Sequence, residues 1–229
     1  MMQETSISTE REIGLEQGKK LFKYGKAAHV HSMLTEGTFR IGTLFEYRTE
    51  EQYGCRIGDS AEGRDSLYDD ADYDLSKPGS FPKMAREFFD TSRSPKNSYV
   101  KDLRILLRRN SVNLYLFCMS KVFDHALMKD FGYDSAFRID EPLQFFHEIS
   151  LTLRRLGITR DTVHVRSCVY RPKHVKYTDQ IYEESPALVK ELKYANQQEV
   201  RAIWTPLCKN IEPVLIQCVP AAQCCSLVK

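Results

Sequence analysis

The longest apolar run in the chain, Leu114 to Met119, has only six residues. A membrane-spanning helix needs about 20 apolar residues, so this run is too short to cross a bilayer. Its length and its mixture of aromatic and aliphatic side chains favour a buried strand. Similar short runs occur at Leu21–Tyr24, Ser135–Ile139, Glu199–Trp204 and Val214–Val219. The chain is therefore expected to build its core from many short strands.

Single helical segments separate these strands. Residues 27–36 carry apolar side chains at helical spacing, and Gly37 stands where that helix would end. Asp140 is predicted to cap a second helix. Further helices are predicted at residues 100–109 and 186–194. Because the order does not repeat a strand–helix–strand unit, it favours an α+β fold with a mainly antiparallel, split sheet and flanking helices.

Residues 49–98 differ in character from the rest of the chain. Four aspartates crowd between residues 69 and 74, Gly and Ser are frequent, and the one periodic stretch is a predicted short helix at 84–89. Long stretches without regular structure are often functional loops. We interpret residues 49–98 as an insertion or lid within a single domain that spans residues 1–229.

The charges nearly balance over the whole chain but not locally. Lys and Arg total 33 and Asp and Glu total 31, for a net charge of +2, which argues against a polybasic protein. Residues 93–109 and 154–176 nevertheless form two basic clusters. Clusters of this kind attract phosphate groups, so nucleic acid is a candidate partner, and an ordinary solvated basic face is the alternative.

Several classes of protein and site are unexpected. The seven cysteines show no C-x-x-C spacing, and the N-terminus has no basic segment followed by an apolar one. These features favour a reduced, cytoplasmic protein that is not a membrane protein. No phosphate-binding P-loop, dinucleotide-binding glycine motif or serine nucleophile elbow is present. No metal site is expected, because His29 and His31 would lie about 200° apart on a helix.

Three segments together resemble the ADP-ribosyltransferase folds. The first is the strand Leu21–Tyr24 with the helix that ends at Gly37 and the strand from Phe39 to Gly42. The second is the apolar strand that closes on Ser120, and the third is Gln197-Gln198-Glu199, a Q-x-E motif immediately before a strand. The resemblance implies a protein that uses NAD as substrate, needs no metal, and transfers ADP-ribose to a nucleic acid or protein.

The resemblance also implies the roles of individual residues. The expected catalytic residues are Glu199 and Gln197, and the expected NAD-binding residues are Lys23, Tyr24, Arg40 and Ser120. Breaking the bond from nicotinamide to ribose creates a positively charged, oxocarbenium-like centre. A carboxylate fixed in advance beside the ribose stabilises that charge, and a neighbouring Gln can orient the acceptor.

The whole chain is also similar to a large uncharacterised prokaryotic family that opens with a YKY-like strand and closes with a W.xE.E.R motif. Lys193-Tyr194 and Gln197 to Arg201 fit the closing motif, with Tyr194 and Gln197 in place of its Trp and first Glu. The transferase resemblance implies a toxin or phage-defence effector. Two alternatives stay open at this point. One is an inactive module of the same fold that binds nucleic acid or protein. The other is a metal-dependent nuclease or hydrolase that takes its carboxylates from the acidic segment.

Overall fold

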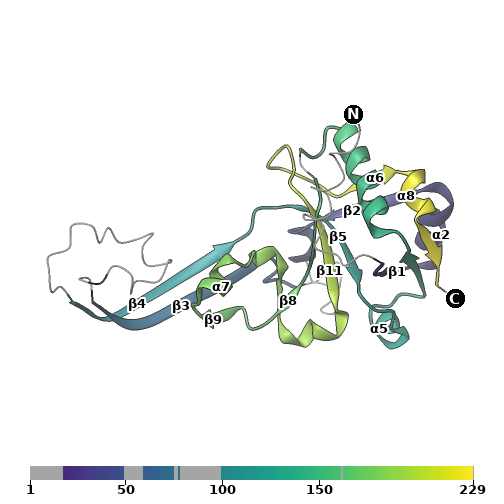
Figure 1. Ribbon diagram of the computed structural model, residues 1–229. Coiled ribbons are helices and arrows are strands. Elements are labelled where there is room, and N and C mark those ends of the chain that lie inside the picture. The colour runs from purple at the N-terminus through teal and green to yellow at the C-terminus, as the bar shows by residue number, and fades with distance from the viewer. Residues whose placement is uncertain (1–17, 49–58, 75–76, 78–98, 161, 229) are drawn as a thin grey trace.

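The computed structural model describes residues 18–48, 59–74, 77, 99–160 and 162–228. The protein is α+β, with mostly antiparallel strand pairs. Figure 1 shows a body made of a sheet and helices, and a long two-stranded arm that projects from it. Within the described residues, no helix combines the length and the apolar character needed to pass through a bilayer.

The body is built on one eight-stranded sheet in which every pair is antiparallel. The order is β12-β2-β5-β1-β6-β13, while β11 pairs with β5 and β7 pairs with β11. The strands are β1 (Leu21–Gly25), β2 (Thr38–Thr43), β5 (Tyr115–Ser120), β6 (Ser135–Ile139), β7 (His164–Ser167), β11 (Glu199–Trp204), β12 (Val214–Gln217) and β13 (Cys225–Leu227).

The sheet divides at β5, and we call this opening the split. β1 pairs with one end of β5, where Phe22 lies opposite Ser120. β2 pairs with the other end, where Gly42 lies opposite Leu116. Among the described residues, the three between these ends, Phe117 to Met119, have β11 as their one partner strand. The split therefore leaves backbone groups in the middle of β5 to be satisfied by other partners.

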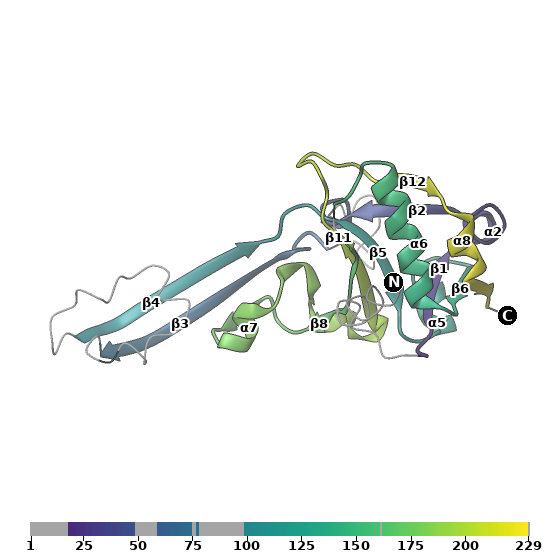
Figure 2. The ribbon, with the colours of Figure 1, turned by 45° about the horizontal axis from the view of Figure 1, so that its top comes forward.

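Three helices cover one face of the sheet (Figure 2). These are α2 (Ala27–Glu36), which joins β1 to β2, α6 (Pro142–Arg155) and α8 (Val219–Gln223). Alternate residues of the strands, including Phe117 and Trp204, point into the core beneath them. The Trp204 indole donates to Ser150 Oγ over 2.8 Å, so its buried N–H is satisfied. The sequence pattern located α2 and α6, whose apolar faces are regular, but it did not predict α8, and the strand predicted to reach Val219 ends at Gln217.

Local chemistry at the helix ends agrees with the sequence in most details. Gly37 ends α2 in a left-handed conformation, as predicted. Pro142 occupies the first turn of α6, but the N-cap is Glu141 instead of the predicted Asp140. Asp140 instead accepts hydrogen bonds from Arg138 and Ser226. The short helix α5 (His125–Asp130) follows β5 and is capped by the Asp124 carboxylate.

The predicted helix at residues 100–109 is wrong. This segment belongs to β4 (Tyr99–Asn110), which pairs with β3 (Arg64–Asp74) to form the arm. Exposure alternates along β4, so its period is two instead of 3.6. Ile105 and Leu107 pack with Leu67 and Tyr177, while Leu106 is 52% exposed. β9 (His174–Lys176) pairs in parallel with β3 near the body, where α7 (Asp179–Glu183) also lies.

The interpretation of residues 49–98 as lacking regular structure is wrong for residues 64–74. They form β3, in which the alternate side chains Asp65, Leu67 and Asp69 are buried. The predicted helix at 84–89 lies outside the described residues. The predicted helix at 186–194 is also wrong, because two short turns, η4 (Pro186–Leu188) and η5 (Leu192–Gln197), flank the strand β10 (Val189–Lys190). β10 pairs in parallel with β8 (Val169–Tyr170).

The close contact between α2 and α8 predicts that Gly37 is needed for stability. An added Cβ at Gly37 would lie 2.6 Å from the Val219 backbone nitrogen, whereas one at Gly132 would meet nothing within 4 Å. Both glycines are left-handed, with φ of 68° and 71°. We expect Gly132→Ala to lower the free energy of unfolding by about 1–2 kcal/mol through strain. Gly37→Ala should lower it clearly further, and equal losses in denaturant titrations would contradict this account.

Candidate active site

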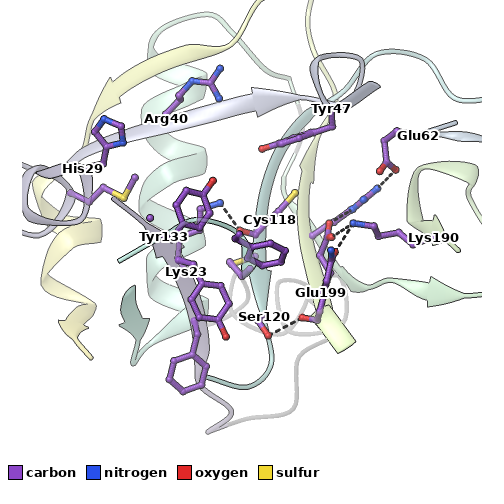
Figure 3. A pocket seen from close by; sticks show the side chains of 18 residues that line it. Lys23, His29, Arg40, Tyr47, Glu62, Cys118, Ser120, Tyr133, Lys190 and Glu199 are labelled. Atoms are coloured by element: carbon purple, nitrogen blue, oxygen red, sulfur yellow. Dashed lines mark hydrogen bonds and ion pairs between the residues drawn. The ribbon is translucent and has the colours of Figure 1, made fainter. Parts of the chain in front are cut away.

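A cavity of about 200 Å³ opens at the split, and we call it the split pocket. Its walls come from β1, β2, β5 and β11, together with α2, η5 and the segments around them (Figure 3). The lining residues are Phe22, Lys23, Tyr24, Gly25, His29, Met33, Arg40, Tyr47, Glu62, Cys118, Met119, Ser120, Phe131, Tyr133, Lys190, Gln197, Glu199 and Arg201.

All six residues expected from the sequence line this one pocket. They come from four segments that are far apart in the chain: Lys23 and Tyr24, Arg40, Ser120, and Gln197 with Glu199. The pairing of Glu199 with Ser120 and of Phe22 with Ser120 brings β11 and β1 to the same point on β5. The sheet topology therefore assembles the predicted site.

Glu199 is buried and doubly paired. Its Oε2 accepts from Lys190 Nζ over 2.6 Å, and its Oε1 accepts from Arg201 Nε over 2.6 Å. Arg201 also donates to Glu62 Oε1 over 2.7 Å and to the carbonyl of Ala187. We call Glu62, Arg201, Glu199 and Lys190 the ionic chain. Its two carboxylates and two cations alternate, so the buried charges compensate one another.

This arrangement keeps Glu199 ionised. Burial alone would raise the pKa of its carboxyl group, but Arg201 and Lys190 outweigh burial and hold the pKa well below its ordinary value. For Lys190, burial would lower the pKa, but Glu199 outweighs that effect and the pKa is raised. The pocket therefore contains a carboxylate that is charged and fixed in orientation before any ligand arrives.

The backbone before Glu199 is also fixed. Gln198 adopts a left-handed conformation with φ of 42°, so the backbone turns between Gln197 and Glu199. Ser120 Oγ donates to the Gln197 carbonyl over 2.9 Å, and the Glu199 N–H donates to the Tyr170 hydroxyl over 2.6 Å. Ser120 thus holds the turn that carries Glu199. The Gln197 side-chain oxygen accepts from Lys190 over 2.8 Å.

Lys23 lies directly at the split. Its Nζ donates to the Cys118 carbonyl over 2.7 Å, which satisfies a backbone acceptor in the part of β5 that neither β1 nor β2 pairs. The same ammonium lies 4.7 Å from the centre of the Phe117 ring, a distance typical of a cation–π contact. Burial lowers the pKa of Lys23. No carboxylate of the described residues forms an ion pair with it.

Tyr24 and Arg40 contribute to the walls in different ways. The Tyr24 hydroxyl donates to the Val122 carbonyl over 3.0 Å and accepts from the Asp124 N–H over 2.9 Å. Tyr24 therefore anchors the loop after β5, and the ring packs against Phe123. Arg40 forms an ion pair with Glu46, and its side chain is 43% exposed. It lies on β2, on the opposite side of the split from Lys23 (Figure 3).

Several lining residues were not expected from the sequence. Arg201 was named only as the last residue of the closing motif, yet it is 2% exposed. Its position two residues after Glu199 in a strand was a usable signal, because such residues share a face. Lys190 was not recognised as a lining residue because it fell within the helix wrongly predicted at 186–194. Glu62 was not recognised because residues 49–98 were interpreted as an insertion. Tyr47, whose pKa burial raises strongly, gave no pattern in the sequence.

The two basic clusters are partly neutralised within the structure. Arg109 and Arg171 both pair with Asp65, whose side chain is fully buried. Lys173 pairs with Asp59 over 2.6 Å. Arg104 and Arg108 remain exposed on the arm. A nucleic-acid partner remains a prediction, and Arg109, Arg171 and Lys173 contribute less to it because they are ion-paired within the protein. In the described part of the chain, no group of three or more His, Cys, Asp or Glu could hold a metal ion.

The ionic chain predicts a pH-dependent loss of stability on Glu199→Gln. Breaking a buried pair costs about 3–5 kcal/mol, so the variant should be less stable than the wild type by about that amount at pH 7. Because the folded pKa of Glu199 is lowered, its contribution is fully present above the ordinary value of 4.5 and is lost as the pH falls through the folded value.

Urea titrations between pH 7 and pH 3 should therefore show the gap between the two proteins narrowing below about pH 4.5. Glu212→Gln is the matched control, because Glu212 is exposed, and it should change stability by less than about 0.5 kcal/mol. A gap that stays constant down to pH 3 would contradict the ionised state of Glu199.

Comparison with protein-family models, with curated proteins and with solved structures gives no match to this chain. The functional argument therefore depends on the chemistry of the split pocket. That chemistry consists of a fixed carboxylate, a lysine without a paired carboxylate among the described residues, and aromatic walls, all at the opening of a divided sheet.

Proposed function

We propose that the protein has an ADP-ribosyltransferase-like fold, binds NAD in the split pocket and transfers ADP-ribose to a macromolecular acceptor. The observation that supports this most strongly is the meeting of all six expected residues in one cavity. They approach it from four separate segments, so a chance match of short motifs would not bring them together. A sheet that opens between β1 and β2 also agrees with the proposed fold.

The charge of the pocket suits a dinucleotide. Four cationic side chains line it, Lys23, Arg40, Lys190 and Arg201, against the carboxylates Glu62 and Glu199 of the lining and Glu46, which pairs with Arg40. The remaining positive charge favours the negatively charged NAD pyrophosphate. Lys23 is the cation best placed to contact a phosphate or the ribose, because no carboxylate of the described residues neutralises it. Tyr47 and Tyr133 offer aromatic surfaces for the nicotinamide ring.

Glu199 would act electrostatically. When the bond between ribose and nicotinamide breaks, nicotinamide leaves as a neutral molecule and positive charge develops on the ribose. Lys190 and Arg201 hold the Glu199 carboxylate in place, so it need not reorganise during the reaction. Each carboxylate oxygen has a second lone pair, which leaves capacity to accept from a ribose hydroxyl. The acceptor nucleophile then attacks the ribose carbon.

A second candidate is a module that binds the same ligand without transferring it. The observation in its favour is that both oxygens of Glu199 already have cationic partners. These partners reduce the negative potential that Glu199 presents to a ribosyl cation. In this case NAD would raise the melting temperature of the protein without any release of nicotinamide.

The transferase proposal predicts an activity loss specific to Glu199. We expect nicotinamide release from NAD in the presence of nucleic-acid or protein acceptors. Glu199→Gln should lower its rate about 10²–10³-fold, as does the loss of a comparable preorganised electrostatic group. The assay is run well below the melting temperature of each variant, in the presence and absence of EDTA. Loss of activity with EDTA would instead favour a metal-dependent hydrolase.

Glu62→Gln is the matched control, because it also removes a carboxylate from Arg201 and disrupts the same ionic chain. It should reduce the rate less than tenfold. An equal loss in both variants would mean that the ionic chain matters only for folding. No release by the wild type, together with stabilisation by NAD, would support the binding module.

A further inference from the structure

The split pocket contains two lysines in opposite environments. Lys190 Nζ lies between Gln197 and Glu199, at 2.8 Å and 2.6 Å from their oxygens, and is committed to the ionic chain. Lys23 Nζ makes one hydrogen bond, to the Cys118 carbonyl, and lies over the Phe117 ring. Within the described part of the chain, Lys23 has no ion-pair partner. An ammonium at this position therefore lacks a paired carboxylate to stabilise its charge.

The surroundings of Lys23 favour its neutral form more than those of Lys190 do. Burial is the largest influence and lowers the pKa of Lys23. Cys118 on β5, Glu199 on β11 and Glu46 after β2 act in the opposite direction, and Arg40 on β2 acts with burial. The net effect is a lowered pKa. A lowered pKa raises the fraction of the neutral amine, which carries the free electron pair that makes a lysine nucleophilic.

We propose that Lys23 forms a Schiff base with a small aldehyde. Lys23 lines the cavity, so a ligand that enters meets its amine. This inference goes beyond the proposed function, since it requires neither NAD nor transfer of ADP-ribose.

The reaction balances without any further reagent. The amine nitrogen attacks the carbonyl carbon, and the carbonyl oxygen takes up a proton to give a carbinolamine. The carbinolamine then loses its hydroxyl group and the remaining nitrogen-bound hydrogen as water. One carbon–nitrogen double bond replaces one carbon–oxygen double bond, and nothing is oxidised or reduced.

The test is reductive trapping with glyoxylate, a small anionic aldehyde, and sodium cyanoborohydride at pH 7.5. Peptide mapping by mass spectrometry follows the rate of carboxymethylation at each lysine of the full chain. We expect Lys23 to react at least tenfold faster than Lys190, the buried and ion-paired control, and than Lys121, an exposed control on the adjacent loop. The Lys23 rate should reach half its maximum below pH 10.5, the ordinary pKa of lysine.

Two further measurements sharpen the result. Glycolaldehyde, a neutral aldehyde of similar size, should also label Lys23 faster than Lys121. Lys23→Arg should abolish labelling in that peptide and leave the rate at Lys121 unchanged.

The proposal would be overturned if Lys23 reacted no faster than Lys121. It would also be overturned if Lys190 reacted as fast as Lys23. Since the assay contains no NAD, its outcome is independent of whether the wild type releases nicotinamide.

Discussion

The ionic chain is the interaction on which the rest of the site depends. Glu62, Arg201, Glu199 and Lys190 come from three separate segments, and their charges alternate in a buried position. Removing any one of them leaves a buried charge with too few partners, which costs more than the pair itself contributes. The ionic chain therefore joins β11 to β10 through Lys190, and to the segment before β3 through Glu62. The same contacts fix the Glu199 carboxylate in the wall of the split pocket.

The split creates the space that the ionic chain faces. Because β1 and β2 use the same edge of β5 at opposite ends, the middle of that edge has no partner strand among the described residues. A sheet opened in this way exposes backbone polar groups, and these must be satisfied to be buried. Lys23 does so for the Cys118 carbonyl. The cavity and its lysine are thus two results of one topological feature.

Much of the body could be predicted from sequence because its elements have regular apolar patterns. The strand Glu199–Trp204 and the helix that ends at Gly37 were found at their correct bounds or within one residue of them. The arm was not found, because β4 alternates Lys and Arg with Leu and Ile in a way that also fits one face of a helix. Pairing with β3 makes this segment a strand and not a helix, and the local sequence pattern does not predict that pairing.

The candidate site shows the same limit. Residues close to a motif, such as Gln197 and Glu199, could be identified, and the topology brought them together with Lys23 and Arg40. Their partners could not be identified in the same way. Lys190 and Glu62 reach Glu199 and Arg201 only through contacts between segments far apart in the chain. The partner of a buried charge cannot be predicted from sequence, because the two residues of an ion pair need no fixed separation along the chain.

The anchor of Lys23 is a main-chain oxygen, and every amino acid at position 118 would supply one. The side chain of Cys118, by contrast, belongs to the pocket wall. The backbone of Cys118 therefore anchors Lys23, while its side chain contributes to the wall. Exchanging the thiol for a larger or a polar group would change the shape and polarity of the wall while the lysine kept its hydrogen bond. A substitution at position 118 would therefore change the wall of the split pocket and leave the anchor of Lys23 in place.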